Sequence, residues 1–337
     1  MKSNKYEIDM CNGSIMDKLV SFALPLMLSG ILQLMFNAVD IIVVGRFSGS
    51  EALAAVGSTT ALINVFTNLF IGISLGANVL AARFFAAGRK EEMSETVHTS
   101  ITLALISGIL MAFVGLVFSK GALELMGTPE DVIGLSTLYM RIYFMGMPFF
   151  MLYNYGAAIL RAVGDTKRPL YFLIIAGVIN AGLNMVLVIV FGLGVAGVGI
   201  ATVFSQMVSC VLVLTCLCRT EGSYKLSFSK LSMKGYYLKQ IFQVGIPAGI
   251  QSTVINFSNA LLQSSVNSFG STAMAGYTAA NNILGFLYVS INSVTQACMS
   301  FTSQNFGVGK YKRMDRVLID CMILSVGAAL VLGCGAY

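Results

Sequence analysis

The chain has 337 residues, of which 56% are hydrophobic and only 11% are charged, and its mean hydropathy is +0.81. An average soluble domain has roughly 25% charged residues, so this composition excludes a soluble protein and predicts an integral membrane protein. The formal net charge of +6 does not indicate a nucleic-acid partner, because the basic loops carry no interleaved aromatic residues for stacking on bases.

Apolar stretches long enough to cross the roughly 30 Å hydrocarbon core of a bilayer as helices recur along the chain. Lys2, Lys5 and Lys18 precede the first, as in a secretory signal, but the run is too long for a signal and leads to Asp40 instead of a cleavage site. We therefore expect a retained first span and an all-α polytopic membrane protein. The nine predicted spans are residues 19–44, 53–80, 97–118, 136–158, 170–191, 195–217, 241–268, 273–302 and 317–337.

The positions of Lys and Arg predict the orientation. If the N-terminus is cytoplasmic, the inner segments hold all of the 21 basic residues except Arg46, Lys120 and Arg141. Cytoplasmic loops of membrane proteins carry such an excess of positive charge. We therefore expect a multi-pass protein of the cell (inner) membrane.

The chain also contains an internal repeat. Pro25 and Asn37 recur 222 residues later as Pro247 and Asn259, and matches of Gly and Phe continue beyond them. Six spans separate the two starts, so both copies enter the membrane from the same side. Transporters built from such parallel repeats commonly bind substrate between them.

The repeat sets the predicted domains. Residues 15–218 form an N-terminal six-helix lobe, residues 219–240 a basic cytoplasmic linker, and residues 241–337 a C-terminal lobe of three helices. Because the second copy is shorter than the first, we expect a C-terminally truncated chain that holds about nine of twelve transmembrane helices.

Asp40 is the one carboxylate placed well inside an apolar span. Ser29, Gln33 and Asn37 precede it at spacings of 4, 4 and 3, which places all four on one helical face. A charge in hydrocarbon costs at least a few kcal/mol and marks a candidate functional site. With no Lys or Arg nearby, desolvation favours the protonated carboxyl, which could load and release a proton. A structural Asp that stays neutral is the alternative.

Further polar side chains fall at depth in other spans. They could line a substrate cavity, or they could hold helices together through hydrogen bonds worth about 0.6 to 2 kcal/mol each. The candidate cavity residues are Gln33, Asn64, Asn68, Asn259, Gln263, Asn282 and Tyr288.

Enzyme chemistry has little support in the sequence. His98 is the single histidine, and no cluster of His, Cys or carboxylate accompanies it, as a catalytic or metal site would require. The seven cysteines lie mostly in apolar spans without a CxxC pair. We expect no enzymatic activity, no metal and no cofactor.

Four segments together resemble the MATE family of multidrug and toxic-compound extrusion transporters. They are FALPLMLSGILQLMFNAVDIIVVGRF, ARFFAAGRKEEM, LRAVGDTKRP and SQNFGVGKYKRM. The resemblance implies two six-helix lobes in a V and a monomer in the bilayer. It also implies alternating-access efflux of amphipathic or cationic small molecules in exchange for H⁺ or Na⁺.

The resemblance further implies that Asp40 is the coupling residue of the N-terminal lobe. A polar cluster would support it, formed by Tyr139, Asn180, Asn184 and Thr202, and Asn37 joins this predicted cluster because it shares the helical face of Asp40.

The chain departs from the family pattern at two places. Asn184 stands where several members carry a second Asp, and the span at 241–268 lacks the acid that some Na⁺-coupled members use. Coupling to H⁺ through Asp40 is therefore preferred over coupling to Na⁺.

Two alternatives stay open at this point. A lipid-linked oligosaccharide flippase of a related fold would be expected to carry basic residues in its cavity for pyrophosphate, and these spans hold almost none. A membrane-embedded enzyme would need a cluster of acidic or histidine side chains near one membrane face.

Overall fold

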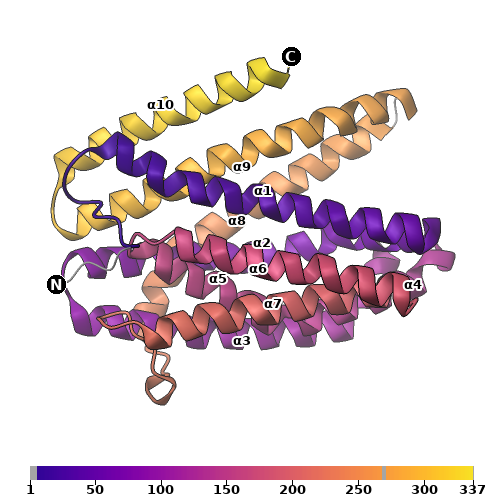
Figure 1. Ribbon diagram of the computed structural model, residues 1–337, viewed down its shortest axis with the longest axis horizontal. Helices are drawn as coiled ribbons and strands as arrows, with labels where there is room; N and C mark the ends of the chain where they lie inside the picture. The colour runs from indigo at the N-terminus through magenta and orange to yellow at the C-terminus, as the bar shows by residue number, and fades with distance from the viewer. Residues whose placement is uncertain (1–5, 268–270, 337) are drawn as a thin grey trace.

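The computed structural model describes residues 6–267 and 271–336, except for some side chains, most of them in the later part of the chain. The described residues are predominantly helical, as predicted (Figure 1). The helices are α1 (Ile15–Phe47), α2 (Gly49–Ala86), α3 (Lys90–Leu125), α4 (Glu130–Met145), α5 (Met147–Ala162), α6 (Lys167–Asn184), the π-helical segment η1 (Met185–Val190), α7 (Gly194–Arg219), the short 3-10 helix η2 (Phe228–Lys230), α8 (Gly235–Asn267), α9 (Ser271–Gly307) and α10 (Tyr311–Ala336).

Each predicted span coincides with a helix or with two consecutive ones, so the all-α fold is confirmed. Six segments of the described chain are long and apolar enough to cross a membrane by length and composition alone. They are α1, α2, α3, the continuous stretch of α6 and η1, α7 and α10.

The fourth predicted span is divided into α4 and α5 at Gly146. Pro148 follows within the first turn of α5. Proline has no backbone N–H to donate, and its ring clashes with the preceding turn, so it starts a helix readily but interrupts one that is already formed. The sequence therefore ends one helix and begins the next at this point.

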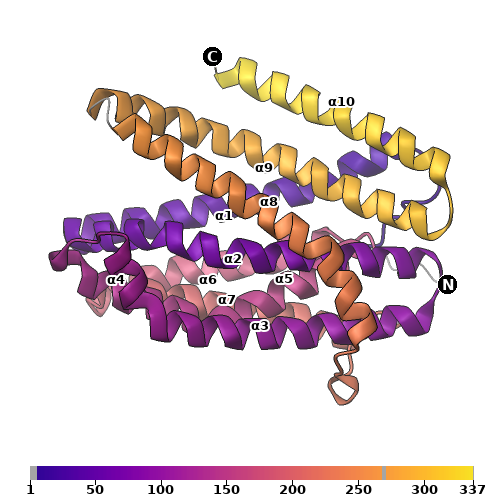
Figure 2. The ribbon, with the colours of Figure 1, turned by 180° about the vertical axis from the view of Figure 1, so that it is seen from behind.

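The helices form two groups that lie side by side (Figures 1 and 2). The first bundle comprises α1 to α7, and the second bundle comprises α8, α9 and α10. The turns from α2 to α3, α5 to α6, α7 to α8 and α9 to α10 gather at one end, on the left in Figure 1. The charge pattern assigns this basic end to the cytoplasm. At the opposite end, α8 and α9 diverge from the first bundle.

Helix α8 crosses α2 at very short range (Figure 2). Gly245 and Gly249 of α8 face Ile73 and Leu69 of α2. A Cβ atom at Gly245 would lie 2.5 Å from the Cα of Ile73, which is closer than real Cβ atoms come to other atoms. Small residues at this crossing allow the two backbones to meet, as is common between helices in membranes.

Helix α1 changes its neighbours along its length. Its first half packs in a core with α9 and α10, where the rings of Phe22 and Phe301 meet edge to face with centroids 5.7 Å apart. Its second half contributes Val43 and Val44 to the core of the first bundle. As a result, α1 is anchored in the second bundle near its start and in the first bundle near Asp40.

Candidate functional site

Asp40 is buried, with 8% of its surface exposed, although it is a carboxylate inside the apolar helix α1, seven residues before its end at Phe47. Its Oδ1 accepts a hydrogen bond from Nδ2 of Asn184, which is fully buried. Asn184 is the last residue of α6 before the π-helical segment η1. Such π-helical turns are rare and frequently occur at functional sites.

The hydrogen bonds continue from Asn184 into the neighbouring helix. Its Nδ2 also lies 3.2 Å from Oδ1 of Asn180, one turn earlier in α6. Nδ2 of Asn180 in turn donates to Oγ1 of Thr202 in α7 over 3.4 Å. We call Asp40, Asn180, Asn184 and Thr202 the Asp40 cluster. It joins α1, α6 and α7 through side chains that are all neutral except the carboxyl itself.

Two tyrosines of α4 accompany the cluster. Tyr139 is 6% exposed and lies close enough to Asp40 to interact with it electrostatically. The ring of Tyr143 is tilted against that of Tyr139 with centroids 6.1 Å apart. The sequence interpretation named Tyr139 but missed Tyr143. The spacing of four residues could have found it, since it places both rings on one face of a helix.

The Asp40 cluster has an unused acceptor. Oδ1 of Asn184 is buried without a hydrogen-bond partner in the described part of the protein. Asp40 also takes part in none of the ion pairs found among the described residues. An ionised Asp40 can accept from the Asn184 amide, and a protonated Asp40 gains an O–H that needs an acceptor. The arrangement can therefore serve either protonation state.

Asn37 lies outside the Asp40 cluster. Its side chain is exposed and forms no hydrogen bond with the cluster among the described residues. The predicted helical face of α1 therefore divides into a buried part at Asp40 and an exposed part at Asn37 and Gln33.

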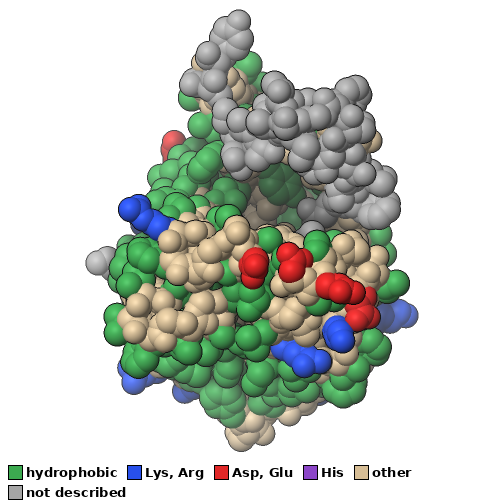
Figure 3. All heavy atoms as spheres, turned by 90° about the vertical axis from the view of Figure 1, so that its right-hand side faces the viewer, with side chains coloured by type: hydrophobic (Ala, Val, Ile, Leu, Met, Phe, Trp, Pro, Cys, Tyr) green, Lys and Arg blue, Asp and Glu red, His purple; other side chains and the backbone are tan. Residues whose placement is uncertain are grey.

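The predicted cavity residues are spread over α1, α2, α8 and α9, through which the two bundles contact each other. Asn64, Asn259 and Tyr288 are exposed, and Asn68 is partly exposed. The side chains of Gln263 and Asn282 lie outside the described residues. Figure 3 looks onto the end where α8 and α9 diverge and shows a recess above the side chains of the first bundle.

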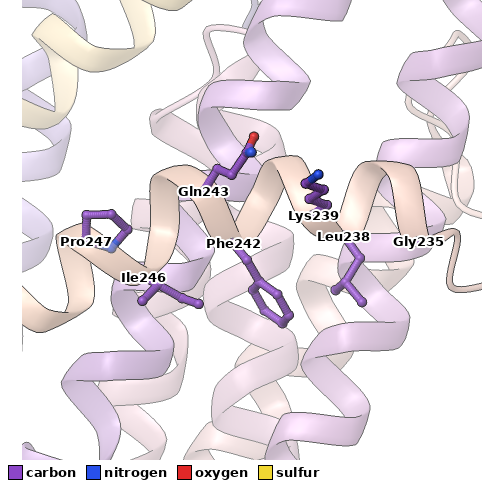
Figure 4. A pocket seen from close by; sticks show the side chains of 7 residues that line it. All are labelled: Gly235, Leu238, Lys239, Phe242, Gln243, Ile246 and Pro247. Atoms are coloured by element: carbon purple, nitrogen blue, oxygen red, sulfur yellow. The ribbon is translucent and has the colours of Figure 1, made fainter.

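A hollow of about 530 Å³ lies elsewhere, along the first turns of α8 (Figure 4). It contains none of the predicted cavity residues, and a single helix lines it, so it does not unite the predicted site. Its lining residues are Gly235, Leu238, Lys239, Phe242, Gln243, Ile246 and Pro247.

The chain matches the family model MatE twice, over residues 25–186 and 247–335. The chain belongs to the MATE family. The two matches begin at Pro25 and Pro247, the positions that the sequence comparison aligned, which supports the internal repeat. A MATE protein is a transporter with several membrane-spanning helices, so the chain is a multi-pass membrane protein, and the alternative of a membrane-embedded enzyme is wrong.

Curated MATE relatives cover most of the chain. It is 34% identical over 306 residues to the probable multidrug resistance protein YoeA of Bacillus subtilis, covering 88% of this chain and 66% of that protein. It is 24% identical over 308 residues to an FAD transporter of Shewanella oneidensis, covering 89% of this chain and 67% of that protein. The multidrug export protein MepA of Staphylococcus aureus is 21% identical over 313 residues, with 93% and 69% covered. The chain thus spans about two thirds of the length of these relatives.

Solved structures share the MATE fold with this chain. A transporter of the MOP superfamily from Pyrococcus furiosus has a TM-score of 0.89 at 24% identity, covering 100% of this chain and 74% of that one. A MATE crystal structure in the straight conformation has a TM-score of 0.90 at 23% identity, with 98% and 74% covered. At these identities the likeness shows the fold alone.

Proposed function

We propose that this chain belongs to a secondary antiporter that exports amphipathic or cationic small molecules in exchange for H⁺ by alternating access. The observation that carries the proposal is the burial of Asp40 against neutral hydrogen-bonding groups, without a cation beside it among the described residues. A carboxyl in such a place can bind and release a proton as its surroundings change.

Coupling to H⁺ is favoured over Na⁺ because the Asp40 cluster has a single carboxylate. Among the described residues its other members are two amides and a hydroxyl. Hard cations are bound by several oxygen ligands at once. The same cluster accommodates a proton without rebuilding its surroundings.

Protonation of Asp40 changes how strongly α1 is held to α6. The ionised carboxylate accepts from Asn184, and hydrogen bonds to charged groups are worth about 1.5 to 3 kcal/mol, roughly twice those between neutral groups. Since the first half of α1 packs on α9, a change at Asp40 alters the attachment between the two bundles. We propose this as the link between proton binding and transport.

The proposed architecture is a monomer with lobes at residues 15–218 and 241–337 and a linker at residues 219–240. The exposed side chains of Asn64, Asn259 and Tyr288, on helices through which the bundles contact each other, support a cavity that accepts amphipathic compounds. The names of the relatives, which include multidrug export proteins and an FAD transporter, support small organic substrates without fixing one. A flippase is less favoured, because the exposed candidate residues carry no positive charge for a pyrophosphate.

The test is efflux of ethidium by the chain reconstituted into liposomes under an imposed pH gradient. Asp40→Asn should abolish gradient-driven efflux, because an amide cannot take up the proton. Asp17→Asn is the matched control, since Asp17 is exposed in the first turn of the same helix. Undiminished proton-driven efflux by Asp40→Asn would refute the role of Asp40. Efflux driven by a Na⁺ gradient and not by a pH gradient would refute H⁺ as the coupling ion.

A further inference from the structure

Residues 6–13, which precede α1, contact both bundles at the basic end of the molecule. We call this segment the amino-terminal clasp. Figure 1 shows it running from beside the first bundle to the start of α1, next to the turn between α9 and α10. Its sequence and its contacts belong neither to the Asp40 cluster nor to the residues between the bundles.

The clasp is held to the second bundle through its own backbone. Asn305, Lys310 and Arg313 all donate hydrogen bonds to its carbonyl oxygens. Nδ2 of Asn305 lies 3.1 Å from the oxygen of Met10, and Nζ of Lys310 lies 2.9 Å from that of Cys11. The side chain of Met10 is fully buried in the core that α9 and α10 share with α1. This side of the clasp is therefore a continuous part of the second bundle.

Other side chains hold the clasp to the first bundle. The hydroxyl of Tyr224, which follows α7, donates to Oε1 of Glu7 over 2.7 Å. The guanidinium of Arg168 in α6 lies over the ring of Tyr6, 5.5 Å from its centroid. The first contact is a hydrogen bond from Tyr224, which is 2% exposed, and the second is a cation–π contact with the exposed ring of Tyr6.

The clasp also makes a close backbone contact with the turn between α5 and α6. Gly164 has φ +95°, and a Cβ atom there would lie 2.6 Å from both N and O of Ile8. Glycine is therefore needed at this position for two reasons. It adopts the positive φ angle readily, and its missing Cβ leaves space for the backbone of Ile8. The first bundle therefore meets the backbone of the clasp closely at Gly164, whereas none of the side chains at residues 6–8 is fully buried.

We propose that the amino-terminal clasp is a latch that keeps the two bundles together at the cytoplasmic end while they diverge at the opposite end. Because the clasp is built into the second bundle, it opens at residues 6–8, where Tyr224, Arg168 and Gly164 hold it to the first. Opening of the cytoplasmic end then requires these contacts to be released. The proposal rests on the alternating access of the proposed function.

The test measures a distance across the cytoplasmic end. Spin labels are attached at Lys90→Cys in α3 and Lys312→Cys in α10, both exposed positions, after replacement of the seven native cysteines. Double electron–electron resonance on the reconstituted chain then gives the populations of closed and open arrangements. The measurement uses neither a proton gradient nor a substrate, so its result does not depend on whether efflux is driven by H⁺.

Tyr6→Ala combined with Tyr224→Phe should raise the ratio of open to closed molecules, by about two- to tenfold for each of the two interactions removed. Tyr6→Phe keeps a ring beneath Arg168 and should leave the ratio unchanged, as should Tyr236→Phe at an exposed site in α8. An unchanged ratio in the double variant, or an equal rise in Tyr6→Phe, would overturn the latch. Size-exclusion profiles of all variants identify any that fail to fold. If the double variant misfolds, Tyr224→Phe alone gives the same test with a smaller change.

Discussion

Gly245→Ala should loosen the crossing of α8 over α2, and its cost follows from the geometry. The added Cβ would lie 2.5 Å from Cα of Ile73, whereas ordinary contacts begin at 3.4 Å, so the shortfall is 0.9 Å. The opposing atoms are backbone and cannot rotate away, so the helices themselves must separate. Overpacking of this kind costs about 1 to 3 kcal/mol. Removing a helical glycine returns about 0.5 to 1 kcal/mol, so we expect a net loss of up to roughly 2.5 kcal/mol, centred near 1 kcal/mol.

The assay is reversible unfolding of the detergent-solubilised chain by titration with sodium dodecyl sulfate, followed by circular dichroism. Gly57→Ala is the matched control, because it lies inside α2 and a Cβ there meets no described atom within 4 Å. This control should stabilise the chain by about 0.5 to 1 kcal/mol through helix propensity alone. The two substitutions are thus expected to have opposite signs. If Gly245→Ala were as stable as Gly57→Ala, the close crossing would be refuted.

Three further predictions concern the segment between α7 and α8. His98→Leu should cost about 1 to 3 kcal/mol in the same titration, because Nε2 of buried His98 accepts the N–H of Ser227 over 3.1 Å and its loss leaves that donor unpaired. Glu95→Gln should change stability by less than about 0.5 kcal/mol, since its 2.7 Å ion pair with Lys234 is solvent-exposed; a larger loss that salt does not reduce would contradict this. Burial, together with the hydrogen bond to Glu7, raises the pKa of Tyr224 to about 12 from 10.0, so its contribution to stability should be full below pH 10 and fall as the pH rises through about 12. The Tyr224→Phe variant should not lose this stability as the pH rises. If it loses the same amount, another group is responsible for the pH dependence.

The helices could be predicted because their length and apolar character are local properties of the sequence. Helix α2 extends from Gly49 to Ala86, beyond the predicted 53–80, because the hydropathy pattern ends near Glu51 and Arg83 whereas the helix continues past both residues. The division at Gly146 could not be read from hydropathy, which stays apolar across it. Pro148 was the residue that could have predicted the division. It lies in the first turn of α5, where a proline starts a new helix.

The site could be predicted only in part. Asp40 stands out in the sequence because a carboxylate is costly in an apolar span. Its partner Asn184 lies 144 residues away in another helix, and no local period connects them, so only the family resemblance suggested the pair. Asn37 shares the predicted stripe on α1 but is exposed. A helical period assumes one environment along a helix, whereas α1 leaves α9 and joins the first bundle part-way along.

Helix α1 connects the amino-terminal clasp to the Asp40 cluster, because it follows the clasp directly in the chain and carries Asp40 near its other end. Asp40 lies 25 residues beyond Ile15, the first residue of the helix, which corresponds to roughly 37 Å along an α-helix. Pro25 lies inside the part that packs on α9, because Leu26 belongs to the same core and Gly30 lies against Val289 of α9, and its missing N–H leaves one helical hydrogen bond unmade there. A helix held by different bundles at its two ends can pass a displacement at one end to the other bundle. We propose that the hydrogen bond at Asp40 and the release of the clasp are coupled through α1, whose first part shares a core with Met10 of the clasp and whose second part carries Asp40.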